Sequence, residues 1–206
     1  MKIRLWAYKF RVAKHVRAAF PKALSHEVDS VFNIVPLSSE RPLFREIGPI
    51  SINGEILHIP NRIYWQQPAQ VEINKLTDIQ VLILACLYTR NYDGFVRERY
   101  LEQIIRHSEE WVIPYIIQLL GEYVIEIIHR IEKSVDYLNK EQFSKFGEEN
   151  PEYIRLTRQR IISYWNAYRR HYEYRVWKQR KIQDDPAFQD DPAYKVMHRL
   201  GLWSTE

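Results

Sequence analysis

The sequence predicts a mainly α-helical protein, either an irregular helical bundle or a short stacked array of helices, with one small β-hairpin near the N-terminus. Three observations support this class. Apolar residues recur every three or four positions through most of the chain. A strand-like alternation appears in ISINGEILHI, around Asn53-Gly54. The composition, 46% hydrophobic and 27% charged over 206 residues, suits a globular protein with a sizeable core.

The most apolar stretch, Trp111 to Leu138, is expected to form the centre of the core. Its large aliphatic side chains have helical spacing: Ile113, Ile117, Leu120, Val124, Ile127, Ile131, Val135 and Leu138. Ser108 is a candidate cap for this helix. Because Pro114 and Gly121 lie inside it, we expect either a kink at Pro114 or a break into a helical hairpin near Gly121.

We expect a single domain, 1–206, with four parts. Residues 1–22 form a basic amphipathic helix that Pro21 ends. Residues 23–76 form a loop and hairpin appendage, with strands near 49–52 and 55–59, because Pro36, Pro42, Pro49 and Pro60 forbid long helices there. Residues 77–183 form the helical core, and residues 184–206 form a short helix and tail.

Within the core, Thr77 is expected to cap a buried helix that runs to about Thr89 and contains Cys86 as a structural residue. The next helix, 95–107, should point Arg97, Glu98, Glu102 and Arg106 outward. Residues 140–150 are interpreted as a polar connection. Pro151 then opens a long basic and aromatic helix to about residue 182.

The charge is unevenly distributed although the net value is only +4. Residues 1–22 carry +7 and residues 151–183 also carry +7, whereas residues 101–150 carry −5. One interpretation is that the basic segments partly neutralise the acidic one. The other is that one basic segment is free to bind an anionic partner.

Three helix starts resemble one another: GFVRERYLEQII, EYVIEIIHRI and EYIRLTRQRII. Their aliphatic residues Val96, Val124 and Ile154 recur at similar spacing. Over about residues 77–160 the chain resembles HEAT-type helical repeats, with NYDGFVRE similar to the start of a second repeat helix and VIPYIIQLL to a first one. Such repeats generally serve as scaffolds for proteins or nucleic acids, and the resemblance implies no more than that. An irregular bundle remains the alternative.

The sequence contains no recognisable catalytic motif, so we expect neither enzymatic activity nor a cofactor. Glu122, Glu126 and His129 share a face if one helix spans them, which makes them a candidate metal site. No second Glu-x-x-His unit is present, and a salt-bridged surface is the preferred interpretation. The repeated DDPA could place Asp184, Asp185, Asp190 and Asp191 around a cation. Helix capping explains the repeat more simply, and Asp191 is expected to start a helix ending at Gly201.

The strongest functional indication lies in residues 153–182. Ile161, Trp165, Tyr168 and Tyr172 follow a helical period and predict one aromatic stripe, with basic residues around it. Arginine interleaved with aromatic residues is typical of phosphate contact and base stacking, and equally of protein interfaces. The preferred interpretation keeps the stripe in the core. The candidate binding residues are Arg158, Trp165, Tyr168, Arg169, Tyr172, Arg175 and Lys178.

From these features we predict a non-catalytic module that binds a protein partner or a second copy of itself as a homodimer. The alternative is a nucleic-acid-binding protein that uses the helix 153–182. We expect no membrane span, because Glu122 and Glu126 interrupt the only apolar run long enough to cross a bilayer. A single cysteine, which forbids an intrachain disulfide, fits a cytoplasmic location.

Overall fold

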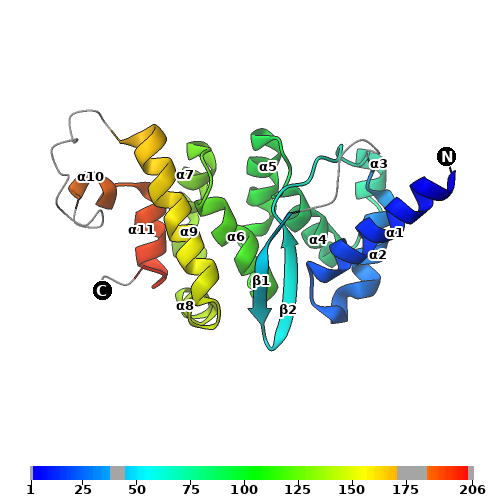
Figure 1. The fold of residues 1–206 in the computed structure, drawn as a ribbon, viewed down its shortest axis with the longest axis horizontal. Coiled ribbons are helices and arrows are strands. Elements are labelled where there is room, and N and C mark those ends of the chain that lie inside the picture. Colours follow the sequence, from blue (N-terminus) through cyan, green and yellow to red (C-terminus); the bar gives the residue numbers. More distant parts are fainter. Residues whose placement is uncertain (1, 38–44, 171–184, 204–206) are drawn as a thin grey trace. The chain divides into compact units, whose positions relative to one another are not determined.

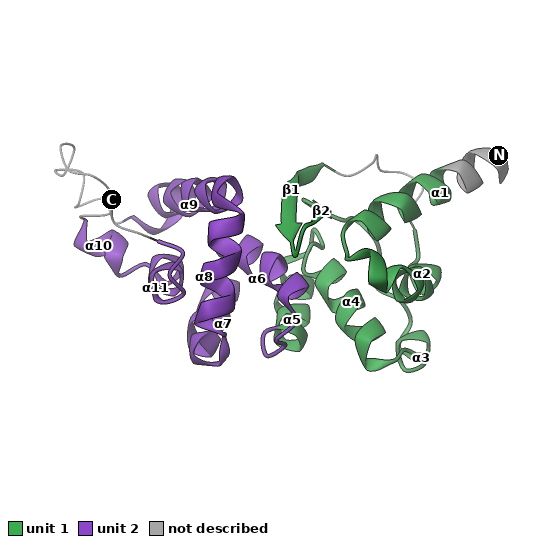
Figure 2. Cartoon of the chain, turned by 90° about the horizontal axis from the view of Figure 1, so that it is seen from below, with its two compact units in different colours: residues 1–104 green, residues 105–206 purple. Residues whose placement is uncertain are grey.

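The computed structural model describes residues 2–37, 45–170 and 185–203 of the protein (Figure 1). It is mainly helical and contains a two-stranded antiparallel hairpin, which confirms the predicted fold class. The chain divides into two compact units, residues 1–104 and 105–206 (Figure 2). The interpretation of the chain as a single domain stays a prediction.

Unit 1 begins with two helices that contact each other, α1 (Lys2–Ala18) and α2 (Ser25–Ile34), joined by the short 3₁₀ turn η1 (Lys22–Leu24). The expectation that residues 23–76 form only loop and hairpin was wrong for α2. Val28, Val31 and Phe32 are spaced three and four residues apart and are buried, so a short amphipathic helix fits before the first proline of that segment. A further short helix, α3 (Gln70–Ile73), lies in the same segment.

The hairpin is the part of unit 1 that the sequence predicted most directly. Strands β1 (Glu46–Ile52) and β2 (Glu55–Pro60) pair antiparallel with Ile50 opposite Leu57. Asn53 and Gly54 both have positive φ, 49° and 80°, as a tight turn of this kind requires. The hairpin also docks on the helices, because the side chain of Glu55 accepts a hydrogen bond from the backbone amide of Lys22 (2.9 Å).

The remaining helices of unit 1, α4 (Asp78–Tyr88) and α5 (Gly94–Ile104), pack on each other. Thr77 caps α4 as predicted, in a capping box completed by the Gln80 side chain, which accepts from the Thr77 amide (3.1 Å). Cys86 is buried in α4. The prediction that Arg97 points outward was wrong: the residue is fully buried, and its Nη1 donates to the carbonyls of Asn91 (2.9 Å) and Tyr92 (3.0 Å). A turn that offers several backbone carbonyls can hold an arginine inside a fold.

In unit 2 the apolar stretch 111–138 forms two helices with a break near Gly121, which is one of the two arrangements predicted from the sequence. A 3₁₀ turn, η2 (Glu110–Val112), leads into α6 (Ile113–Leu120), and α7 (Ile125–Ser134) follows, then η3 (Val135–Tyr137). Pro114 lies in the first turn of α6, where a missing N–H costs no helical hydrogen bond. Ser108 does not cap this helix: it begins at Ile113 after Val112, so the predicted start was wrong.

The segment 140–150, interpreted as a polar connection, is helix α8 (Lys140–Glu149). The Asn139 side chain caps it by accepting from the Gln142 amide (3.2 Å), and Phe143 and Phe146 are buried. The sequence signal for this helix was a capping asparagine, Asn139, followed by two phenylalanines three positions apart. Helix α9 (Pro151–Tyr164) follows directly and contacts α8 and α6.

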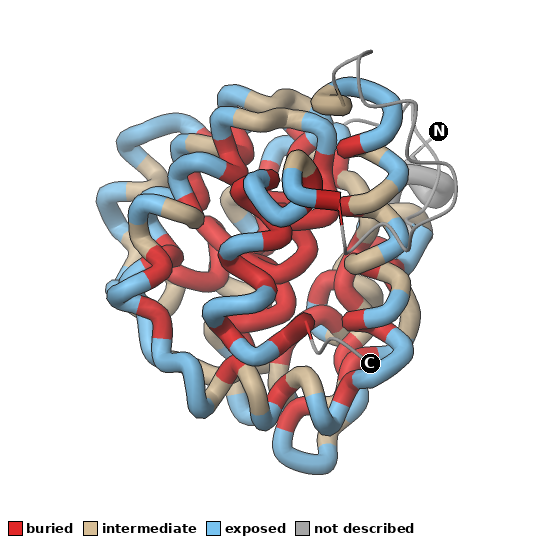
Figure 3. Tube along the Cα trace, turned by 90° about the vertical axis from the view of Figure 1, so that its left-hand side faces the viewer, coloured by how far each residue is buried: buried red, intermediate tan, exposed pale blue. Residues whose placement is uncertain are grey.

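The three similar helix starts of the sequence correspond to α5, α7 and α9, and each of these helices contacts the helix before it in the chain. In amphipathic helices such as α7 and α8, buried and exposed positions alternate within each turn, and Figure 3 shows bands of this kind along the trace. Assignment of these pairs to HEAT-type repeats stays a prediction.

Candidate binding surface on unit 2

The basic and aromatic segment does not continue as one α-helix beyond residue 164. Helix α9 ends at Tyr164, and the π-helical turn η4 (Trp165–Arg169) follows. A π-turn holds more residues than an α-turn, so the predicted period is lost at this point. Ile161 and Trp165 are buried, as the core interpretation of the stripe expected, whereas Tyr168 is 71% exposed. Tyr172, Arg175 and Lys178 lie outside the described residues.

Arg158 is turned toward the C-terminal segment. Its Nε and Nη2 both donate to the carbonyl oxygen of Leu202 (2.9 and 2.6 Å), and its guanidinium lies over the ring of Trp203 (5.6 Å to the centroid). An arginine that donates twice to one carbonyl while stacking on an indole acts as a packing residue. Arg158 therefore holds the segment at Leu202 and Trp203 against α9.

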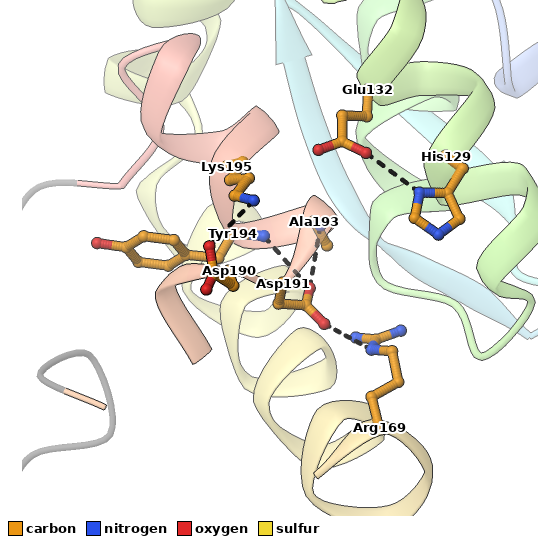
Figure 4. A network of polar contacts seen from close by, with 8 residues as sticks. All are labelled: His129, Glu132, Arg169, Asp190, Asp191, Ala193, Tyr194 and Lys195. Atoms are coloured by element: carbon orange, nitrogen blue, oxygen red, sulfur yellow. Dashed lines mark hydrogen bonds and ion pairs between the residues drawn. The ribbon is translucent and has the colours of Figure 1, made fainter. Parts of the chain in front are cut away.

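Arg169 has a similar role toward the last helix, α11 (Pro192–Arg199). Its Nε lies 2.6 Å from Oδ2 of Asp191 (Figure 4). The two groups form a buried ion pair, with 13% of the Arg169 side chain and 1% of the Asp191 side chain exposed. Asp191 also caps α11, since its Oδ1 accepts from the amide of Ala193 (3.0 Å). Burial raises the pKa of the Asp191 carboxyl above its ordinary value, although Arg169 and the capping amides act in the opposite direction.

Arg170, the next residue, makes a similar contact with the helix that precedes α11. Asp185 caps α10 (Pro186–Gln189) by accepting from the Ala187 amide (3.0 Å), and Nη2 of Arg170 lies 4.0 Å from Oδ2 of Asp185. The Arg170 guanidinium also lies over the Trp165 ring (5.2 Å to the centroid). Two consecutive arginines thus face two consecutive Asp-Pro helix starts, which gives the second aspartate of each DDPA repeat its role.

These contacts confirm the capping interpretation for Asp185 and Asp191. Asp190 is 82% exposed at its side chain and pairs with Lys195 (3.2 Å), while Asp184 lies outside the described residues. The basic residues of α9 and η4 pair with other groups than the acids of 101–150 that the sequence suggested. For Arg169 and Arg170 the partners come from the C-terminal helices, and Arg155 pairs with Glu152 of its own helix (2.7 Å).

A cluster of three tyrosines forms where α9 meets the loop between α6 and α7. The ring centroids of Tyr123, Tyr164 and Tyr168, which we call the tyrosine cluster, lie 6.1 to 6.5 Å apart. Tyr123 is 52% exposed, so the cluster presents aromatic surface to solvent. The sequence pattern missed it because Tyr123 was placed inside a helix; the break at Gly121 was the signal that could have indicated it.

Close packing at Gly121 brings the loop to α9. A Cβ atom at this glycine would lie 3.4 Å from Cβ of Arg160, so the two backbones approach closely. Arg160 then donates from Nη1 to Oε1 of Gln118 (3.1 Å), and the buried Tyr153 hydroxyl donates to the same oxygen (3.2 Å). The loop that bears Tyr123 is therefore packed against α9, which bears Tyr164.

The candidate metal residues are not brought together. Glu122 precedes α7 and is buried, whereas Glu126 and His129 lie on α7 and are exposed. His129 Nδ1 lies 3.1 Å from Oε2 of Glu132 (Figure 4). The three residues share no helix face because the helix begins only at Ile125. In the part of the chain that the structure describes, no group of three His, Cys, Asp or Glu side chains is placed to hold a metal ion.

Among the described helices, none combines the length and the apolar character that crossing a bilayer requires. Comparison with known proteins adds no family to these observations: no family model, no curated protein and no solved structure matches the chain.

Proposed function

We propose that this protein is a non-catalytic binding module for a protein partner or for a second copy of itself, and that the tyrosine cluster is its contact surface. The observation that carries the proposal is the exposure of Tyr123 and Tyr168, 52% and 71%, within a group of three touching rings. Tyrosine contributes large contact area at a small cost in side-chain entropy and is enriched among the residues that dominate interface energies.

The core of unit 2 does not require these rings at the surface. Trp165 and Ile161 already fill the inward side of this segment, and Trp165 packs edge-on against Phe188 with 5.2 Å between centroids. Tyr164 and Tyr168 instead stack on each other, with 29° between their planes. Rings that neighbour one another are held in place before a partner arrives, which lowers the entropy cost of binding.

Nucleic-acid binding through the helix 153–182 is less well supported by the described residues. Base stacking on Tyr168 would need cations beside it that contact phosphates. Arg169 is largely buried against Asp191, Arg158 is directed at Leu202, and Arg155 pairs with Glu152. The two functions are separated by the experiment below.

The full chain is used as bait for affinity capture from its source cells, with and without nuclease, in parallel with sedimentation velocity of the purified protein. The matched variants are Tyr123→Ala/Tyr168→Ala and Tyr137→Ala, since Tyr137 is 65% exposed but outside the cluster. We expect the double variant to lose a nuclease-resistant partner, or to lose the dimer, with a decrease in affinity of roughly 30-fold or more. Tyr137→Ala should retain it.

Retention of the same partner and of the same oligomeric state by the double variant would contradict the assignment of the cluster. Capture that disappears on nuclease treatment would support the nucleic-acid alternative instead. Circular dichroism of the double variant serves as the folding control, because removal of exposed rings should change stability little.

A further inference from the structure

Unit 1 has an open groove between α1 and α2, independent of the tyrosine cluster. Its volume is about 270 Å³. Helix α1 contributes Lys9, Phe10 and Arg17 to the lining, and α2 contributes Phe32 and Asn33. Both helices belong to the same compact unit and contact each other, so the groove is formed within one body.

The groove is lined by one exposed and one buried aromatic side chain, Phe10 and Phe32. Helix α1 buries its other face, with Val12 and Val16 each only 1% exposed. Phe10, on the groove side, is 58% exposed, whereas Phe32, which lines the groove from α2, is 3% exposed. A large aromatic side chain at the edge of a groove with an aromatic floor offers contact area for an apolar side chain of a partner.

The α1 side of the groove is basic, whereas α2 carries Glu27 and Asp29. Residues 1–26 contain no aspartate or glutamate. Arg17 is partly neutralised by Asp29, which accepts from its Nε (2.5 Å) and Nη2 (2.9 Å). Lys9 and Lys14 are exposed and form no ion pair with any residue that the structure describes. Lys9 is therefore the lining cation that has no acidic partner among the described residues, and Lys14 adds a second exposed cation on α1.

We infer that this groove binds a short acidic peptide segment of a protein partner that carries one large apolar anchor residue. The anchor would lie between Phe10 and Phe32, and carboxylates on either side of it would face Lys9 and Lys14. Charge complementarity selects an acidic partner, and the Asn33 side-chain amide can donate to and accept from its backbone. A groove between two helices is also the geometry in which an amphipathic peptide buries its apolar face.

Two other anionic partners fit the groove less well. A lipid bilayer is too flat to reach Phe32 at the floor, and the buried face of α1 is committed to the core. Phosphates of a nucleic acid would meet Lys9 and Lys14, but they would leave the exposed ring of Phe10 uncovered. Both partners are included in the test as competing outcomes.

The test is a fluorescence anisotropy titration of the full chain with a labelled amphipathic peptide of about two heptads, built from Glu and Leu. Its matched probes are the peptide with Gln in place of Glu, phosphatidylserine-containing vesicles, and a thymidine oligonucleotide. We expect the Glu peptide to bind most tightly, and its affinity to fall with added salt. Phe10→Ala and Lys9→Glu/Lys14→Glu should each weaken it by about tenfold or more.

Three control variants locate the effect. Lys133→Glu/Lys140→Glu makes the same change in net charge on exposed positions of unit 2, and Phe95→Ala removes another exposed aromatic ring of unit 1. Tyr123→Ala/Tyr168→Ala removes the tyrosine cluster. All three should bind the Glu peptide as the original chain does. The inference is overturned if the groove variants bind normally, if the Gln peptide binds equally well, or if vesicles or the oligonucleotide bind more tightly than the peptide.

Discussion

Oδ2 of Asp191 lies 2.6 Å from Nε of Arg169, and the two side chains are only 1% and 13% exposed. The same aspartate caps α11 through the amide of Ala193. One buried carboxylate thus starts the last helix and neutralises the cation at the end of the π-turn. Because both functions depend on a single group, the attachment of the C-terminal helices should be sensitive to its removal.

Asp191→Ala should lower the free energy of unfolding by about 3 kcal/mol, because it removes a cap and leaves a buried guanidinium without its charge partner. Chemical denaturation followed by circular dichroism measures the change. Asp190→Ala is the matched control, since its side chain is 82% exposed, and it should change stability by less than about 0.5 kcal/mol. Equal effects of the two substitutions would contradict the role assigned to Asp191.

The stability of the protein should depend on the titration of Asp191 in a defined direction. Burial raises the pKa of its carboxyl in the folded state above the ordinary 3.8. Between pH 3.8 and the raised pKa of the folded state, the folded protein binds more protons than the unfolded chain. The contribution of Asp191 to stability therefore falls as pH rises through this window. The measurement is the free energy of unfolding against pH for the original chain minus that for Asp191→Asn. A difference that rises with pH in this window would show that the ion pair outweighs burial.

Thr77→Ala should destabilise the protein by about 1 kcal/mol through loss of the capping box at α4. The Gln80 side chain also bonds Glu27 of α2 (2.6 Å), so the box connects two helices. Urea denaturation gives the change in stability. Thr77→Ser keeps the hydroxyl and should restore most of the loss; a serine variant as unstable as the alanine variant would argue against capping as the cause.

Tyr88→Phe should cost about 1 kcal/mol, because the buried hydroxyl donates to the carbonyl of Gln66 (2.6 Å) and the substitution leaves that acceptor without it. Burial also raises the pKa of the Tyr88 hydroxyl above its ordinary value, so this hydroxyl keeps the proton that it donates. Thermal unfolding measures the cost, with Tyr92→Phe as control because Tyr92 is 48% exposed. If Tyr92→Phe destabilised the protein as much as Tyr88→Phe, the loss of the hydrogen bond to Gln66 could not be the cause.

Several local features of this fold could be predicted because their energetics involve residues near one another in the chain. Asn53 and Gly54 adopt the positive φ of the hairpin turn, Thr77 caps α4, and Asp191 caps α11 before Gly201 ends it with φ 72°. Turn and cap interactions are made within about one helical turn of sequence, so a short segment suffices to recognise them.

The candidate site was predictable only in composition. The segment 153–182 is basic and aromatic, but no local pattern indicates that Trp165 is buried while Tyr168 is exposed. The π-turn changes the period at that point, and its arginines are held by aspartates of later helices. The prediction that Arg97 is solvent-exposed failed for a similar reason, since the carbonyls that hold it belong to a turn outside its helix.

By itself the sequence determined that the protein is mainly helical, where its hairpin turns and how several helices begin, because hydrophobic period and capping act over a few residues. The tertiary structure alone decided that Tyr123 joins Tyr164 and Tyr168, and that Arg169 is directed toward Asp191. These contacts join separate elements. Which face of a helix remains in solvent depends on what packs against the other face, and that is a property of the folded chain.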